Sequence, residues 1–169
     1  MRHILSVLVN DQPRVLARVA GLLGRRNFNI ESISVGESEE PGLSRMVIAT
    51  RGDEQTMEQV QKQLHKLVDV IKVQDLHDQS AVERELLLVK VGSGPGTRME
   101  LSGIIEPFRA SIVDVGSHSL IIQATGERSK LDALLELLHP YGIKEVARTG
   151  VTALPRGANK ASMALTAGG

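Results

Sequence analysis

The stretch Ile4-Leu5-Ser6-Val7-Leu8-Val9-Asn10-Asp11-Gln12-Pro13-Arg14-Val15-Leu16 decides how the first part of the chain is interpreted. Residues 4–9 carry apolar side chains on both faces of an extended segment, which is typical of a central strand. Beyond this stretch, apolar residues recur at helical spacing over 16–23. Asp11 can cap this helix, and Pro13 suits its first turn. The sequence therefore predicts a strand, a short polar loop and an amphipathic helix.

The alternation of strand and helix patterns continues and gives the fold class. Strands are predicted over 28–35, 43–50 and 68–76, and Asp53 can cap a second helix that ends near residue 67. The order β-α-β-β-α-β is the ferredoxin-like plan, an antiparallel sheet with both helices on one face. A second pass of the same order begins near residue 84. The prediction is an α+β protein with two tandem ferredoxin-like domains.

The domain limits follow from polarity and turn signals. Residues 1–77 form the first domain, the polar segment 78–83 is the linker, and residues 84–154 form the second domain. The segment 155–169 is small, polar and glycine-rich, so we expect a mobile tail. In the second domain, Thr97 and Glu100 are spaced as a capping box, and Pro107 ends or kinks the helix that follows.

Composition excludes several classes of protein. Lys+Arg and Asp+Glu are equal at 20 each, so no strong net field favours nucleic acid. The absence of cysteine excludes disulfides, thiolate metal sites and a cysteine nucleophile. No apolar stretch approaches the ~20 residues of a membrane-spanning helix, and we expect a cytoplasmic protein. The central strands of the first domain hold no aromatic residue on which RNA bases could stack.

The first loop is a candidate site for a small carboxylate, because a helix start presents unpaired N–H groups and the positive end of the helix dipole. The backbone amides of Arg14, Val15 and Leu16 would bind the carboxylate of an amino acid, and Asp11 would accept its ammonium group. The purely structural alternative, which spacing alone favours, is that Asp11 only caps the helix. Asn29 could reach the loop across the sheet or from a dimer partner, or could simply be a turn residue that tolerates a left-handed backbone.

The remaining motifs give weaker indications of function. The segment Gly92-Ser93-Gly94-Pro95-Gly96 follows a strand and precedes a helix, but it lacks the spacing of a phosphate-binding loop, and its proline has no N–H to donate. A flexible turn is favoured there, with a second small-ligand site as the alternative. The five histidines are scattered without metal-ligand spacing, and no serine lies in a nucleophile elbow.

A set of short motifs in a fixed order resembles one family. The motifs are Asn29-Ile30-Glu31-Ser32, Leu43-Ser44-Arg45-Met46, residues 62–70, residues 82–91 and Ala147-Arg148-Thr149-Gly150-Val151. From Met1 to about Gly157 the chain is similar to the small, regulatory subunits of acetohydroxyacid synthase (acetolactate synthase). The first half is similar to an ACT domain.

The resemblance implies a non-catalytic subunit that binds the catalytic subunit, raises its activity and confers feedback inhibition by branched-chain amino acids, chiefly valine. The partner would carry thiamine diphosphate, Mg²⁺ and FAD and would make acetolactate from pyruvate. This chain would bind no cofactor or metal and hold no catalytic residue. Small subunits of this family form a homodimer through their ACT domains, and the effector lies at that interface.

Carried over by position, the effector site comprises Asp11, Arg14, Val15, Leu16, Asn29 and Ile30. Asn29 matches the effector-contacting asparagine of the family. Arg14 departs from the usual glycine, and an arginine cannot adopt a positive φ cheaply. It could instead form an ion pair with the ligand carboxylate. The alternative function is therefore a constitutive activator that has lost effector sensitivity through Arg14; a stand-alone enzyme has no supporting motif.

Overall fold

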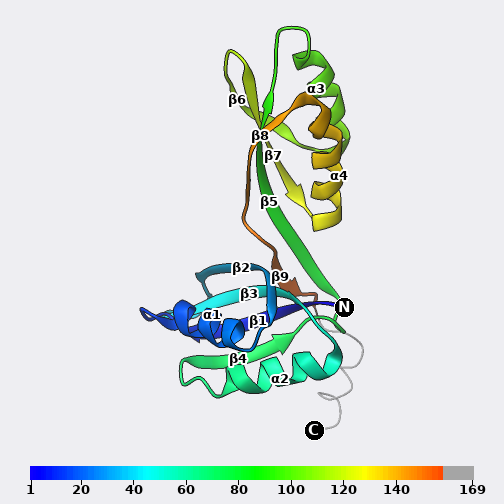
Figure 1. The fold of residues 1–169 in the computed structure, drawn as a ribbon. Coiled ribbons are helices and arrows are strands. Elements are labelled where there is room, and N and C mark those ends of the chain that lie inside the picture. Colours follow the sequence, from blue (N-terminus) through cyan, green and yellow to red (C-terminus); the bar gives the residue numbers. More distant parts are fainter. Residues whose placement is uncertain (158–169) are drawn as a thin grey trace. The chain divides into compact units, whose positions relative to one another are not determined.

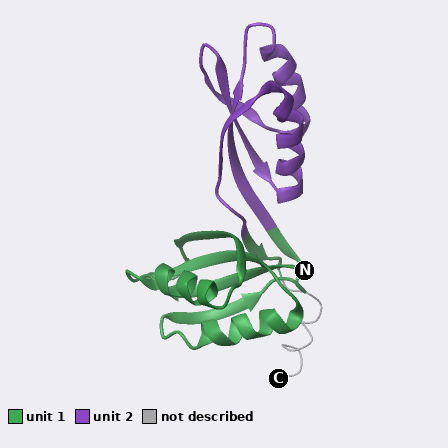
Figure 2. Ribbon diagram, viewed as in Figure 1, with its two compact units in different colours: residues 1–82, 153–169 green, residues 83–152 purple. Residues whose placement is uncertain are grey.

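The computed structural model describes residues 1–157, and its fold consists of two compact units (Figure 2). The first unit contains residues 1–82 together with the described residues from Ala153 onward, and the second contains residues 83–152. Most of the predicted tail, residues 158–169, lies outside the described residues. Each unit has an antiparallel sheet and two α-helices, so the predicted fold class is confirmed.

The first unit follows the predicted order (Figure 1). Its elements are β1 (Arg2–Asn10), α1 (Val15–Arg25), β2 (Asn29–Glu37), β3 (Leu43–Arg51), α2 (Glu54–His65) and β4 (Val70–Asp75). The strands lie in the order β2-β3-β1-β4, so β1 is central, as its apolar sequence predicts. One face of the sheet packs against the apolar stripes of both helices. The central members of this core are Leu5, Val7, Val19, Leu23, Ile48, Met57, Val60 and Leu64.

The second unit repeats the plan with short additions (Figure 1). Its elements are β5 (Ala81–Gly92), α3 (Arg98–Ile105), the 3-10 turn η1 (Glu106–Phe108), β6 (Ser111–Val115), β7 (Ser119–Gly126), α4 (Arg128–Leu138), the 3-10 turn η2 (His139–Tyr141) and β8 (Ile143–Arg148), and the short strand β9 (Thr152–Pro155) follows them in the chain. The sheet order is β6-β7-β5-β8, and β9 pairs with β5. The core residues that the two helices and the sheet share are Leu87, Val89, Val91, Leu101, Leu120, Ile122, Leu131, Leu134 and Leu138.

The observed limits differ from the predicted ones at two places. β5 already begins at Ala81, so half of the predicted linker is strand. β9 was not predicted, and its residues Ala153 and Leu154 group with the first unit rather than with the second. The segment is held by pairing with β5 and by the N–H of Arg156, which donates to the carbonyl of Ser80 at 2.8 Å. A four-residue strand of this kind depends on such distant partners and has no periodicity of its own to reveal it.

The predicted start of the first helix is wrong. α1 begins at Val15, its N-cap residue is Arg14, and no side chain makes a capping hydrogen bond. Asp11 therefore does not cap the helix, and Pro13 lies before it rather than in its first turn. The loop is one turn longer than the sequence suggests, because Arg14 adopts a left-handed conformation that delays the helix.

The other helix signals give mixed outcomes. Asp53 caps α2 as predicted, accepting a hydrogen bond from the N–H of Thr56 at 2.7 Å. Thr97 is the N-cap of α3, but it makes no capping bond, because its hydroxyl pairs with the backbone of Gly94. The predicted capping box with Glu100 is therefore wrong. Pro107 ends α3 as predicted, since the helix stops at Ile105. Among the described residues, no helix is long and apolar enough to cross a membrane.

Glu39 provides a test of the turn between β2 and β3. Arg45 donates two hydrogen bonds to its carboxylate, at 2.9 and 3.2 Å, and these lower the pKa of Glu39 from 4.5 to about 2. Because the folded-state pKa is depressed, the pair contributes stability above pH 4.5 and loses it as the pH falls toward 2. In an NMR pH titration we expect the Glu39 carboxyl to titrate near 2 in the wild type and at a higher pH in Arg45→Gln, where only the backbone hydrogen bond still lowers its pKa. Asp53, whose pKa is lowered by Thr56, is the control, since this variant should leave its titration unchanged. A wild-type midpoint near 4.5 for Glu39 would contradict the prediction.

Candidate functional site

The loop between β1 and α1 is tied to its two neighbours by backbone hydrogen bonds. The N–H of Asn10 donates to the carbonyl of Asp69 at 2.9 Å, and the N–H of Asp11 donates to the carbonyl of Gly42 at 2.8 Å. The first contact holds the loop to the connection between α2 and β4. The second holds it to the turn between β2 and β3. The loop is thus a fixed part of one end of the sheet.

The backbone at the start of α1 presents donors for an anion. Arg14 has φ 76° and ψ −9°, and the first intrahelical bond runs from Arg18 to its carbonyl. The N–H of Val15 makes a long bond of 3.4 Å to the carbonyl of Gln12, so the sequence-based assignment of this amide to a ligand is weakened. In the part of the chain that the structure describes, the N–H groups of Arg14 and Leu16 make no hydrogen bond. These two donors and the positive end of the α1 dipole are available to a carboxylate.

The side chains of the loop differ in exposure. Val15 is buried in the core of the first unit, so only its backbone could take part in binding. Asp11 is exposed, and Leu16 is 47% exposed although it lies on a helix with a buried apolar face. An exposed carboxylate and an exposed apolar side chain therefore flank the two unpaired amides. This combination suits a small amino acid with an apolar side chain.

Asp69 holds the base of the loop through its side chain as well. Its carboxylate accepts hydrogen bonds from Nη1 of Arg18 at 2.8 Å and from Nδ2 of Asn10 at 3.4 Å. With the backbone bond to Asn10, one residue joins the end of β1 and the first turns of α1. The sequence did not reveal this clamp, since Asp69 lies 59 residues from Asn10.

The sheet register places Asn29 far from the loop within one chain. Asn29 is paired with Arg51, and Arg51 with Arg2 at the start of β1, whereas Asn10 is paired with Leu43. The strands β1 and β2 are therefore parallel, and Asn29 lies at the end opposite the loop. Eight strand residues correspond to roughly 26 Å. The prediction that Asn29 reaches the loop across its own sheet is wrong, so Asn29 could take part in a site at the loop only from a second copy.

Asn29 and Ile30 differ in their surroundings. The carbonyl of Asn29 accepts a hydrogen bond from the hydroxyl of Thr50 at 2.6 Å, while the residue itself is exposed. Ile30 is half-buried and packs against the core of the first unit. The side-chain amide of Asn29 is thus exposed on the edge strand β2. The packing of Ile30 against the core holds the adjacent Asn29 in place.

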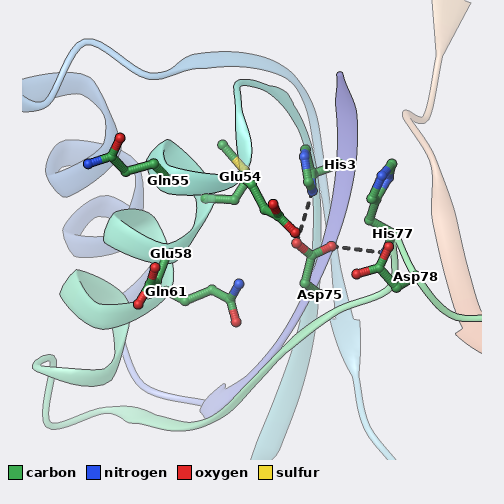
Figure 3. A pocket seen from close by; sticks show the side chains of 9 residues that line it. His3, Glu54, Gln55, Glu58, Gln61, Asp75, His77 and Asp78 are labelled. Atoms are coloured by element: carbon green, nitrogen blue, oxygen red, sulfur yellow. Dashed lines mark hydrogen bonds and ion pairs between the residues drawn. The ribbon is translucent and has the colours of Figure 1, made fainter.

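Apart from the loop, the first unit has a hollow of about 470 Å³ that contains carboxylates and histidines (Figure 3). His3 is buried, its Nδ1 lies 2.9 Å from the carboxylate of Asp75, and its ring centroid lies 4.4 Å from that of His77. The N–H of His77 donates to the same carboxylate at 2.9 Å. Asp75 therefore connects the end of β4 to β1, so its carboxylate has a structural role in this hollow. Among the described residues no group of three or more His, Cys, Asp or Glu side chains is arranged for a metal ion.

Comparison with known proteins agrees with the two-unit architecture. Residues 5–72 match the family described as AHAS small subunit-like ACT domain, and residues 84–157 match the family described as small subunit of acetolactate synthase. The chain is 52% identical to the acetolactate synthase small subunit of Bacillus subtilis over 93% of its length and 92% of the relative's. It is 54% identical to a probable acetolactate synthase small subunit of Methanothermobacter thermautotrophicus, covering 92% and 93% of the two chains.

A solved structure gives the same relationship in three dimensions. The crystal structure of the acetolactate synthase small subunit from Thermotoga maritima superposes with a TM-score of 0.86 at 45% identity. The match covers 94% of this chain and 99% of that one. Both matched families, the sequence relatives and the solved structure agree along the chain. The protein therefore belongs to the family of acetolactate synthase small subunits, with an ACT regulatory domain in its first unit.

Proposed function

We propose that this protein activates the catalytic subunit of acetolactate synthase and confers feedback inhibition by branched-chain amino acids, with valine as the first choice. Family membership and the ACT domain support a regulatory subunit with a catalytic partner. The catalytic subunit would carry thiamine diphosphate, Mg²⁺ and FAD and would condense two pyruvates. The observation that carries the effector site is the register of the first sheet, which separates Asn29 from the loop.

A two-fold dimer through β2 resolves this separation. β2 is an edge strand of the sheet, and an edge strand is a template for pairing with a second copy. Two copies related by a two-fold axis pair such strands in antiparallel order. The Glu37 end of β2 lies at the loop end of the sheet, since Glu37 pairs with Ser44 and Asn10 with Leu43. Asn29 of the partner subunit then lies near the loop, and each dimer has two equivalent sites.

The chemistry of this composite site fits an α-amino acid. The ligand carboxylate would accept hydrogen bonds from the backbone N–H groups of Arg14 and Leu16 and from the side-chain amide of Asn29 of the partner subunit. The carboxylate of Asp11 would accept a hydrogen bond from the ligand's ammonium group. The exposed side chain of Leu16 would contact the branched apolar side chain. A ligand that binds both protomers stabilises one arrangement of the dimer over another, with a coupling of ~1–3 kcal/mol typical of such effects.

The proposal is tested with the matching catalytic subunit. Acetolactate formation would be measured with and without this protein, each with and without valine. We expect activation by the protein and reversal of that activation by valine. Activation that valine, leucine and isoleucine all leave unchanged would favour the constitutive activator. No activation under any condition would contradict the subunit role.

The conformation of Arg14 favours the alternative function, a constitutive activator without effector control. Arg14 lies in the left-handed region, at a position where the family resemblance suggests glycine. Arg14→Gly should raise the free energy of unfolding by about 1 kcal/mol, since an L-residue is strained at this φ. We expect valine to bind both proteins in calorimetric titrations, because Arg14 already holds the turn in the conformation that glycine would adopt. Arg14→Ala, which retains the strain but lacks the guanidinium, is the matched control. Valine binding gained only by Arg14→Gly would support loss of effector control in the wild type.

Asp69 should act on valine binding without touching the ligand. Asp69→Asn loses the ion pair to Arg18 but retains an acceptor for Asn10, and we expect valine to bind about threefold to tenfold more weakly. Because Arg18 is 55% exposed, the stability loss should stay within about 1 kcal/mol. Calorimetric titration and thermal unfolding measure the two effects. Asp78→Asn, on an exposed aspartate of the same unit, is the control, and an equal effect of this variant on valine binding would refute the role of Asp69.

A further inference from the structure

We propose that the second unit binds a compact phosphate-bearing anion in a hollow of about 400 Å³. This site is separate from the proposed effector site and goes beyond the proposed function. It lies where the start of β5, the corner before β6 and the corner between β7 and α4 meet. Its lining residues are Arg84, Arg109, Thr125, Gly126, Glu127 and Lys130.

Three cations from three separate segments converge on this hollow. Arg84 precedes Glu85, which pairs with Gly126 at the end of β7, so the register brings Arg84 beside the β7–α4 corner. Lys130 belongs to the first turn of α4, and Arg109 to the corner that follows η1. Since these residues are far apart in the sequence, their meeting reflects the fold and not a local run of charge.

Among the residues that the structure describes, none forms an ion pair with these three cations. The guanidinium of Arg84 donates to the carbonyl of Glu83 at 2.6 Å, and the ammonium of Lys130 donates to the carbonyl of Thr125 at 3.0 Å. In the described residues the side chain of Arg109 has no hydrogen bond or ion pair. Glu127 is the one carboxylate among the described residues that line the hollow, so three positive charges face one negative charge there. The hollow has an excess of positive charge that a dianion would neutralise.

The backbone around the hollow supports the same arrangement. Arg109 has φ 52°, a left-handed conformation that is costly for arginine and that turns the chain into β6 at this point. A Cβ at Gly126 would lie 2.7 Å from Cδ of Lys130, so glycine allows the lysine stem to lie across the strand end. The N-cap of α4, Glu127, makes no side-chain capping bond, which leaves the positive end of this helix in the lining.

The chemistry of the lining selects the class of ligand. None of its residues has a large apolar side chain, so it does not suit a branched-chain amino acid. Guanidinium groups bind tetrahedral phosphate oxygens with two donors, and lysine supplies a point charge. A phosphate-bearing metabolite and a small tricarboxylate share this anionic chemistry. We assign the phosphate because a helix N-terminus and paired arginines both match phosphoryl oxygens.

The test uses the full chain and pyrophosphate as the probe, with inorganic phosphate and citrate as comparison ligands at constant ionic strength. We expect calorimetry to show one pyrophosphate per chain, bound more tightly than citrate. Lys130→Gln and Arg109→Asn should each lower the affinity for pyrophosphate about tenfold or more, because each removes a charge-assisted contact to it. Asparagine is chosen at 109 because it tolerates the left-handed region. Lys144→Gln removes an exposed cation of the same unit and should leave the affinity unchanged.

The possible results separate this site from the effector site. Thermal unfolding of each variant verifies the fold, and valine titration of the same samples should be unchanged, since the proposed effector residues lie in the first unit. Gly126→Ala provides a second variant that moves Lys130 without changing charge, and it should also weaken pyrophosphate. Equal weakening by Lys144→Gln, tighter binding of citrate, or no saturable binding of pyrophosphate would overturn the proposal.

Discussion

Replacing Arg148 with methionine is expected to lower the free energy of unfolding by about 3–5 kcal/mol, the cost typical of breaking a buried ion pair. Arg148 donates to both carboxylate oxygens of Glu85, at 2.9 and 3.2 Å, and to Asp132 at 2.8 Å. Glu85 is only 6% exposed, so the variant leaves its carboxylate in the protein interior without its guanidinium partner. Urea unfolding monitored by circular dichroism measures the loss.

A matched control lies on the same network. Arg128 is paired with Asp132 at 3.7 Å, and both side chains are nearly half exposed, so Arg128→Met should cost less than about 1 kcal/mol. The double variant Arg148→Met with Glu85→Leu should recover much of the loss, because it removes the isolated carboxylate as well. A loss in Arg148→Met no larger than that in Arg128→Met would mean that Glu85 is solvated in the folded state.

Much of the fold could be predicted because its signals are local. The apolar residues of β1 lie on both faces, so a central strand follows from composition alone. Asp53 directly precedes α2 and caps it, and Pro107 follows the end of α3 by two residues. Each of these features depends on a few neighbouring residues. Local physics and the global fold agree in such places.

The start of α1 could not be predicted in the same way. Asp11 and Pro13 are ordinary helix-start residues, yet the helix begins later because Arg14 takes a positive φ. Composition favours glycine or asparagine for that conformation and gives no sign of it at an arginine. The exposed, uncapped start of α1 is therefore a feature that only the backbone geometry reveals.

Contacts between residues far apart in the chain could not be predicted from the sequence either. Arg148 meets Glu85 across 63 residues, and the charge pattern of neither strand indicates the partner. Sheet order decides whether Asn29 lies near the first loop, and a sequence that predicts four strands does not by itself give the distance between their ends. The candidate residues could be named from the sequence, but only the register shows that Asn29 and the loop lie at opposite ends of the sheet within one chain.

Mixed dimers should show whether the effector site is shared between protomers. Asp11→Ala removes the proposed acceptor for the ammonium group, and Asn29→Ala removes the side-chain amide that we propose the partner subunit supplies. Each variant alone should lower the affinity for valine about tenfold to one hundredfold, because each loses a hydrogen bond to a charged group of the ligand. The exposed positions of both residues predict little change in the free energy of unfolding.

When the two variants are mixed and allowed to exchange subunits, half of the dimers contain one protomer of each kind. In such a dimer one site combines the intact loop of the Asn29→Ala protomer with the intact Asn29 of the Asp11→Ala protomer. About a quarter of all sites should therefore regain wild-type affinity, and calorimetry should count them as about one high-affinity site per four chains. Sedimentation of each variant confirms that the dimer persists. A site contained within one protomer could not be restored in this way, so a mixture as weak as its components would exclude the shared site.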